Sequence, residues 1–264
     1  MDLQGCTAVV TGASTGIGRV TAIALAQRGA RVWAAARDLG RLEQLAAEQT
    51  GITPHRADVS VDADRTALVA AAGEIDLLVN NAGIGHYGLV ESMTPEQVRA
   101  LWETNVIGLI DLSQRVLPGM LARRRGHIVN VGSIAGFVAA PTETVYCATK
   151  HAVLAFTEGL RRELAGRGVD VTLIAPGVIK TEFKARARTG KPADVPGALD
   201  SGSSPDLVAK AIIRVVTAPH VPGRDVVTVP RYAGWSRLGA LPGLAKATDR
   251  ATRRRVQDAL KGKQ

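Results

Sequence analysis

Along the first 230 positions, short and nearly continuous apolar runs alternate with longer stretches of helical period. Such uninterrupted runs, rich in Val, Ile and Ala, are typical of strands buried on both faces of a parallel sheet. The predicted strands are Thr7–Thr11, Val32–Ala36, Thr53–Ala57, Asp76–Asn80, His127–Val131, Asp170–Ala175 and Asp225–Val229. The predicted helices cover about 17–28, 62–72, 95–123, 144–165 and 205–217.

This alternation predicts a single α/β domain over residues 1–230, with a doubly wound, Rossmann-like sheet. We expect seven strands, mostly parallel, with helices on both faces. Residues 183–204 are rich in Gly, Pro, Ala and Ser, which predicts a flexible flap over a substrate. From residue 231 the pattern changes to a short apolar piece and a basic helix, so 231–264 is predicted to be a C-terminal extension.

Composition narrows the class of protein. With 46% hydrophobic and 22% charged residues the chain is ordinary for a globular protein. No apolar stretch approaches the roughly 18 residues of a membrane-spanning helix, and the first strand follows Met1 too closely for a signal peptide. Two cysteines make no disulfide framework, and neither they nor the five histidines have metal-ligand spacing. We therefore expect a reducing, cytoplasmic setting and no bound metal.

The net charge of +9 is concentrated at the C-terminus. Residues 231–264 hold nine Lys/Arg against two Asp, so the predicted domain carries only +2. A nearly neutral domain argues against nucleic-acid binding. The extension places apolar residues such as Trp235 near Arg253–Arg255, which suits an anionic membrane surface. A solvated helix held by a few apolar contacts is favoured over membrane binding.

A glycine-rich turn follows the first predicted strand and leads directly into a helix. Glycines let the backbone approach a pyrophosphate, and a helix N-terminus offers N–H groups and a positive dipole. A structural turn would also explain the glycines, but their place after the first strand of a βαβ unit favours nucleotide binding. The residues predicted to hold the nucleotide here are Gly12, Ser14, Thr15, Gly16, Ile17 and Gly18.

The end of the second strand bears on which nucleotide binds. A carboxylate at this point would bind the ribose 2′-hydroxyl of NAD, but Ala36 provides none. Arg37 follows, and its planar guanidinium suits a 2′-phosphate. Asp38 could pair with Arg37 or bind the ribose itself. NADP(H) is therefore favoured over NAD(H).

Tyr146 and Lys150 stand four residues apart, on one face of a predicted helix. A free phenol has a pKa near 10, and a neighbouring ammonium would lower it toward the working range of an acid/base catalyst. Ser133, after the fifth strand, could hydrogen-bond a substrate oxygen while charge develops on it. Together with the glycine turn, these three residues predict hydride transfer from a nicotinamide.

Further motifs stand in order along the chain: Asp58-Val59, Asn80-Asn81-Ala82-Gly83, Asn105, Ser133, Tyr146-x-x-x-Lys150, and Pro176 to Thr181. With the glycine turn, these residues make residues 5–230 resemble the short-chain dehydrogenase/reductase family. The resemblance implies that Tyr146 is the general acid in reduction and the base in oxidation. It also implies that Tyr146 and Lys150 contact the cofactor, with Lys150 holding the nicotinamide ribose, that Ser133 orients the substrate oxygen and that Asn105 supports a water-linked proton path.

The same resemblance implies further contacts with the cofactor. Asp58 and Val59 would lie by the adenine, Asn81, Ala82 and Gly83 beside the ribose, and Gly177, Ile179 and Thr181 at the nicotinamide. Two of these features have simpler explanations: the Asn80–Gly83 segment could be a turn, and Asn105 could mark a helix bend.

The reaction we predict is hydride transfer between NADP(H) and a carbonyl or alcohol substrate, small or lipophilic because the expected cleft segments are apolar. A non-redox epimerase or dehydratase on the same scaffold, and a catalytically idle nucleotide sensor, are the alternatives. A homodimer or homotetramer is expected. The 231–264 extension puts the family's usual tetramer in doubt, because it stands where many members have a glycine-rich end.

Overall fold

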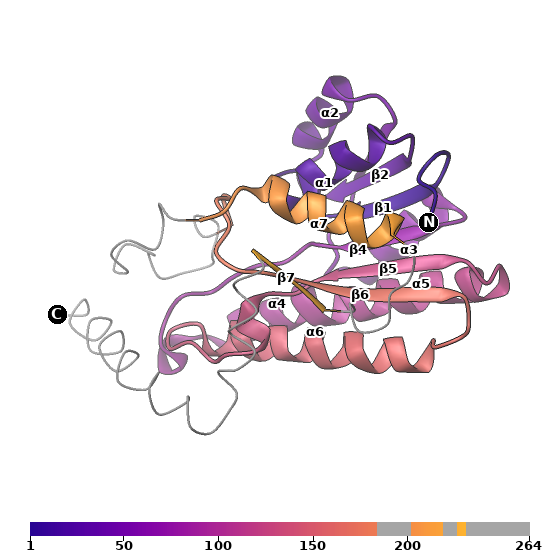
Figure 1. Cartoon of the computed structure of the whole chain (residues 1–264). Coiled ribbons are helices and arrows are strands. Elements are labelled where there is room, and N and C mark those ends of the chain that lie inside the picture. The colour runs from indigo at the N-terminus through magenta and orange to yellow at the C-terminus, as the bar shows by residue number, and fades with distance from the viewer. Residues whose placement is uncertain (184–201, 219–225, 231–264) are drawn as a thin grey trace.

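The computed structural model describes residues 1–183, 202–218 and 226–230. Its sheet has seven strands in the order β3-β2-β1-β4-β5-β6-β7, and every neighbouring pair is parallel (Figure 1). The strands are β1 (Thr7–Thr11), β2 (Arg31–Ala36), β3 (Ile52–Arg56), β4 (Leu77–Asn80), β5 (Gly126–Val131), β6 (Val169–Pro176) and β7 (Val226–Val229). The predicted doubly wound α/β fold is confirmed.

Helices cover both faces of the sheet (Figure 1). One face carries α1 (Gly16–Ala26), α2 (Leu39–Glu48) and α7 (Pro205–Thr217). The other carries α3 (Asp62–Ala72), α4 (Pro95–Trp102), α5 (Gly108–Ala122) and α6 (Thr144–Glu163). A π-helical turn, Glu103–Ile107, joins α4 to α5, and short 3-10 turns lie at Val90–Ser92 and Ile134–Gly136.

Side chains of each central strand divide between two cores, because successive residues of a strand point to opposite faces. In β4, Leu77 and Val79 pack under α1, α2 and α7, whereas Leu78 packs under α3, α5 and α6. In β1, Val10 packs in the core with Leu77, and Val9 packs in the core with Leu78. Both faces are apolar, and for this reason the strands appear in the sequence as unbroken hydrophobic runs.

Two helical features differ from the prediction. Helix α2 was not expected, because only Leu42 and Leu45 of its residues are buried and its apolar pattern is short. Its N-terminus is fixed by Asp38, whose carboxylate accepts a hydrogen bond from the Arg41 N–H at 3.1 Å. The single helix predicted over 95–123 is divided by the π-helical turn, which holds Asn105 in the interior.

Strand order reverses between β1 and β4, since the chain runs outward to β3 before returning to the other side of β1. In open α/β sheets, ligands bind beyond the carboxyl ends of the strands at such a switch point. The loops after β1, β4, β5 and β6 carry many of the predicted site residues, and the others lie after β2 and β3 or on α1, the π-helical turn and α6.

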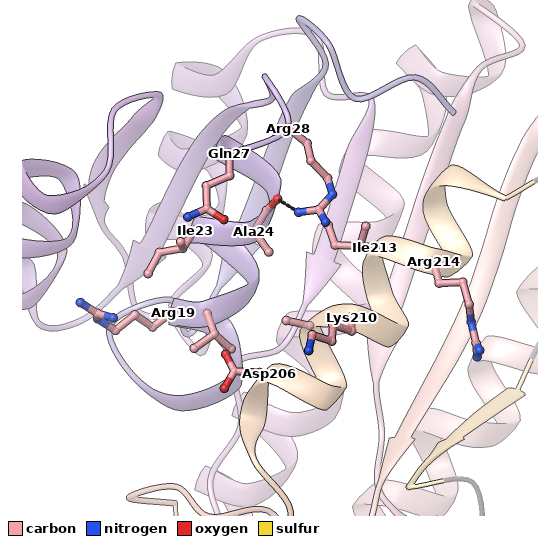
Figure 2. Close-up of a pocket in the computed structure, with 11 residues that line it drawn as sticks. Arg19, Ile23, Ala24, Gln27, Arg28, Asp206, Lys210, Ile213 and Arg214 are labelled. Carbon is pink, nitrogen blue, oxygen red and sulfur yellow. Dashed lines mark hydrogen bonds between the residues drawn. The ribbon is translucent and has the colours of Figure 1, made fainter.

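A separate groove of about 560 Å³ lies between α1 and α7 (Figure 2). Arg19, Arg28, Asp206 and Lys210 are among the residues that line it. The Arg28 guanidinium donates to the Ala24 carbonyl at 2.8 Å, and its charged neighbours do not converge on a common point (Figure 2). The predicted site residues are absent from its lining. The switch point, not this groove, is therefore the candidate site.

Among the described residues, none of the helices combines the length and the apolar character of a membrane span. Within the same residues, there is no group of three or more His, Cys, Asp or Glu side chains that could hold a metal ion. The predicted extension, 231–264, and residues 184–201 of the predicted flap lie outside the described part of the chain.

Candidate active site

The loops after β1 and β4 are joined at the switch point by Thr11. Its hydroxyl oxygen accepts hydrogen bonds from the N–H groups of Asn81 and Ala82, each at 3.0 Å. The Asn81 side-chain amide donates in return to the Thr11 carbonyl at 2.9 Å. Asn80 is the last residue of β4, and residues 81–83 continue as irregular backbone held against the loop after β1, so the simpler explanation of a turn over Asn80–Gly83 is wrong. Sequence reasoning did not single out Thr11, which reads only as the last residue of a strand.

Glycine is required at two points of the loop after β1. Gly12 has a φ of +65° and Gly16 a φ of +54°, a region that side chains rarely adopt. A Cβ on Gly12 would lie 2.9 Å from the Ala82 Cα, and one on Gly16 would lie 3.1 Å from the Thr181 side chain. The loop is therefore packed between the segments that follow β4 and β6.

Helix α1 begins at Gly16, and Thr15 occupies its N-cap position without a side-chain capping bond in the described structure. The N–H groups of the first turn and the positive end of the helix dipole lie at the end of the glycine loop, an arrangement that suits a phosphate. Ser14 is half-buried in the loop, Ile17 packs on the core, and Gly18 is buried against the Gly12 backbone. This cradle, which side chains would fill, fits a dinucleotide pyrophosphate.

Arg37 follows β2 and extends into solvent, with 59% of its side chain exposed. Its guanidinium lies 3.9 Å from an Asp58 carboxylate oxygen. Asp38 caps α2 and pairs with Arg41 at 3.4 Å. Val59 is buried in the core, whereas the Asp58 carboxylate is partly exposed and accepts from the Ser60 hydroxyl at 2.7 Å.

Ser133, Tyr146 and Lys150 are brought together where β5 ends beside the first turns of α6. The Ser133 side chain lies close enough to Tyr146 to lower the pKa of its phenol. The Ser133 oxygen accepts from the Ala135 N–H at 3.1 Å, which fixes its position. The Lys150 ammonium donates to the Val131 carbonyl at 3.1 Å and lies 5.8 Å from the centre of the Tyr146 ring. Tyr146 and Lys150 are both buried.

Burial dominates the pKa values of this group. It lowers the pKa of Lys150 to about 8, because the charged ammonium is deprived of water. Burial also raises the pKa of Tyr146, an effect that the neighbouring Ser133 side chain opposes and that the charge of Glu143 reinforces. The expectation that the pKa of Tyr146 is lowered is therefore wrong for this structure. The phenol is held in its neutral form.

Asn105 lies inside the π-helical turn and is 1% exposed. Its amide oxygen accepts from the Ile84 N–H at 2.8 Å, and its amide nitrogen donates to the Ile84 carbonyl at 3.0 Å. The residue therefore marks an irregular helix, as the simpler explanation held, and in addition supports the loop after β4. In that loop, a Cβ on Gly83 would lie 3.2 Å from the Asn105 oxygen and 3.8 Å from the Lys150 ammonium.

The segment after β6 crosses the crevice. The Gly177 N–H donates to the Val229 carbonyl at 2.7 Å, and Ile179 pairs with Ser203 in an isolated bridge. Thr181 contacts the Gly16 side of the glycine loop and accepts from the Phe183 N–H at 3.3 Å. Beyond it, Glu182 pairs with Arg41 of α2 at 3.0 Å. This segment therefore lies over both the glycine loop and the start of α2.

An apolar wall surrounds Tyr146. The Phe183 ring lies 5.8 Å from the Tyr146 ring at an angle of 54°. The buried members of this cluster are Leu101, Ala135, Tyr146 and Cys147, with Ile84, Met93, Ala140, Val145 and Phe183 packed against them. Two further residues after β4 are withdrawn from water. His86 is 4% exposed, and burial raises the pKa of the Tyr87 phenol.

A glycine-lined helix N-terminus at the switch point of a parallel sheet, with a buried Ser, Tyr and Lys beside it, defines a nucleotide-binding oxidoreductase. The family model described as "short chain dehydrogenase" matches residues 6–192. The chain belongs to the short-chain dehydrogenase/reductase family.

Known relatives agree with this assignment. An uncharacterized oxidoreductase of Myxococcus xanthus is 40% identical over 216 residues, which cover 79% of this chain and 84% of the relative. The closed form of a serine dehydrogenase complexed with NADP⁺ superposes with a TM-score of 0.79 at 32% identity, covering 84% of this chain and 94% of that one. A Burkholderia phymatum family member in complex with NAD has a TM-score of 0.80 at 29% identity, covering 90% and 94%.

Proposed function

We propose that this protein is an NADP(H)-dependent dehydrogenase/reductase that transfers a hydride between the nicotinamide and a carbonyl or alcohol substrate, with Tyr146 as the acid/base. The observation that carries the proposal is the buried Tyr146 side chain, which lies beside the Ser133 hydroxyl and the Lys150 ammonium. These groups stand at the carboxyl end of β5, where the crevice opens.

The bound nicotinamide would supply or accept the hydride. In reduction, the Tyr146 hydroxyl donates a proton to the substrate oxygen, and Ser133 holds that oxygen by a hydrogen bond. A phenol whose pKa is raised by burial is fully protonated at neutral pH, as a proton donor must be. After the transfer, the Lys150 ammonium, charged below about pH 8, stabilises the phenolate that remains.

The nucleotide would be held mainly by the loops that follow β1, β2, β4 and β6. The glycine loop would bind the pyrophosphate, Asn81 to Gly83 the ribose, and Thr181 the nicotinamide amide. We propose that Asp58 and Val59 lie beside the adenine. Val59 would contribute its backbone, because its side chain is buried. Lys150 would hold the nicotinamide ribose, and Asn105 would support the proton path.

NADP(H) is the preferred nucleotide in this proposal. The serine dehydrogenase neighbour binds NADP⁺ and the Burkholderia phymatum neighbour binds NAD, so the fold accommodates both. Here Ala36 offers no carboxylate to a ribose 2′-hydroxyl, and Arg37 is exposed at the end of β2. Its guanidinium, 3.9 Å from Asp58, lies beyond ordinary hydrogen-bond distance and can turn toward a 2′-phosphate.

The apolar wall around Tyr146 supports a lipophilic substrate. An epimerase or dehydratase, or a nucleotide sensor, would need the same nucleotide cradle, but a pure sensor would not need the buried Ser–Tyr–Lys arrangement. The homo-oligomer, the cytoplasmic location and the role of residues 231–264 stay predictions.

The test follows NADPH absorbance with a panel of lipophilic ketones and aldehydes, and NADP⁺ reduction with the matching alcohols. Turnover that is lost in Tyr146→Phe supports the proposal. Tight NADPH binding without net oxidation of NADPH by any carbonyl contradicts it. In that case, isomerisation or water loss from a hydroxylated substrate would indicate the non-redox use of the scaffold.

A further inference from the structure

Thr149 lies between Tyr146 and Lys150 on α6 and is completely buried. Its hydroxyl donates to the Tyr146 carbonyl at 2.7 Å and accepts from the Asn105 amide nitrogen at 3.2 Å. It thus connects the helical turn that carries the phenol with the π-helical turn that precedes α5. Thr149 is not among the residues predicted to touch nucleotide or substrate.

The direction of these hydrogen bonds is fixed by the backbone. The Ile84 N–H can only donate, so the Asn105 amide must present its oxygen to it. The Asn105 nitrogen then faces Thr149 and must donate to the hydroxyl oxygen. The hydroxyl proton is consequently directed to the Tyr146 carbonyl, which can only accept. Each buried partner is satisfied in a single arrangement.

The same hydrogen bonds also hold the loop after β4 close to the Lys150 ammonium. Asn105 holds Ile84 by both backbone groups, and Gly83, the preceding residue, approaches the Lys150 ammonium. The loop after β4 and the Tyr146–Lys150 turn of α6 are therefore held at a fixed separation by Thr149 and Asn105. A small change in this separation would move the Tyr146 hydroxyl relative to a ligand held by the loop after β4.

We propose that Thr149 is a positioning residue of the active site, which acts through Asn105 to hold the loop after β4 in place against the Tyr146–Lys150 turn. The proposal rests on the proposed function for its effect on the rate. It does not require Thr149 to contact substrate or nucleotide.

The test compares Thr149→Val, which keeps the shape but removes the hydroxyl, with Thr149→Ser, which keeps the hydroxyl. We expect kcat for carbonyl reduction to fall about 10- to 100-fold in Thr149→Val, because misplacement by about 1 Å has an effect of this size. The serine variant should stay within about threefold of wild type, and the Kd of NADPH should change less than kcat in both.

Thr157 provides a matched control on the same helix. It is 2% exposed, donates to the Val153 carbonyl and accepts from the Asn130 amide at 3.0 Å, so its bonding is the same in kind. Thr157→Val should lower the thermal midpoint of unfolding about as much as Thr149→Val, without the fall in kcat. If both valine variants lose kcat equally, Thr149 is merely a structural residue and the proposal is overturned.

A double variant examines the route through Asn105. If Thr149 acts through this amide, Thr149→Val should add little to the loss of kcat in Asn105→Ala. Losses that multiply in the double variant would contradict this route.

Amide hydrogen exchange at Ile84 decides the proposal without any turnover. The Ile84 N–H should exchange faster in Thr149→Val than in wild type, Thr149→Ser or Thr157→Val. If the wild-type protein reduces no carbonyl, the proposed function fails on its own, and exchange at Ile84 still determines whether Thr149 holds the loop. Unchanged exchange in Thr149→Val would overturn the inference.

Discussion

The glycine loop after β1 and the Ser133–Tyr146–Lys150 group beyond β5 belong to the same crevice but have different physical properties. The first offers backbone N–H groups, and the neighbouring strand β2 ends at the exposed charge of Arg37. The second consists of side chains that are largely removed from water, with pKa values displaced by burial. Binding in the first depends on shape and screened charge, whereas chemistry in the second depends on a few desolvated groups.

This difference orders the effects of substitution. A desolvated group interacts strongly with its neighbours and has no substitute when it is removed, whereas water and salt compensate for part of a lost surface charge. We therefore expect the largest effects among the buried groups and the smallest at Arg37. The order would be reversed if nucleotide binding, and not chemistry, were the main task of the crevice.

The largest effect is expected for Tyr146→Phe. Removing the hydroxyl eliminates the proton donor and leaves the ring in its apolar wall, so kcat should fall about 10²–10⁴-fold. The Kd of NADPH, measured by fluorescence, should stay within about threefold, since removing one cofactor contact leaves the other nucleotide-binding groups in place. A variant that keeps more than a tenth of wild-type kcat would assign the proton transfer to another group.

Lys150 should affect stability in a pH-dependent way. Its pKa is about 8 in the folded protein, against an ordinary value of 10.5 for a lysine in water, so between these values the unfolded chain binds more protons. This group therefore makes the free energy of unfolding rise as the pH increases from 8 to 10.5, and below pH 8 it costs roughly 3 kcal/mol.

Lys150→Met should accordingly be more stable than wild type at neutral pH, by an amount that shrinks toward pH 10. Urea unfolding at several pH values measures this difference in the free energy of unfolding, and Lys210→Met, at an exposed position, serves as the control. A stability difference that does not vary with pH would show that Lys150 keeps its ordinary pKa.

Gly12→Ala should weaken NADPH binding about tenfold or more and destabilise the fold by about 1–2 kcal/mol, because its φ is +65° and a Cβ would meet the backbone of Ala82. Gly159, in α6, has nothing within 4 Å of a Cβ and serves as the control. Gly159→Ala should be neutral or slightly stabilising. Equal behaviour of the two variants, by calorimetry and thermal unfolding, would remove the steric argument for the cradle.

Arg37→Ala should have the smallest effect. Its exposed guanidinium is screened, so we expect the KM for NADPH to rise about tenfold and that for NADH to change less than about twofold. The rise for NADPH should diminish at high salt. Steady-state kinetics with both nucleotides measures the ratio, and equal changes in the two KM values would exclude Arg37 as the 2′-phosphate group.

The same contrast explains how far the sequence could predict the molecule. The buried strands were recognised because both of their faces are apolar, as Leu77 and Leu78 illustrate. Helix α2 was missed because it contributes only two fully buried side chains and lies at the edge of the sheet. Tyr146, Lys150 and Ser133 were found from spacing along a helix and position after a strand.

Contacts between segments distant in the chain were not predictable in this way. Thr149 meets Asn105 across 44 residues, and Arg41 meets Glu182 across 141. The direction of the Tyr146 pKa shift was missed for a related reason. Spacing placed a cation near the phenol but gave no measure of how far both groups are removed from water.

The π-helical turn before α5 has a consequence for insertions and deletions. Each residue of an α-helix advances the side-chain direction by about 100°, and a π-turn accommodates one residue more than an α-turn. Deleting one residue within Glu103–Ile107 would let the helix regain regular winding, but it would rotate Asn105 and the start of α5 relative to each other. Length at this point is therefore constrained as strictly as residue identity, although the segment is neither a loop nor part of the substrate wall.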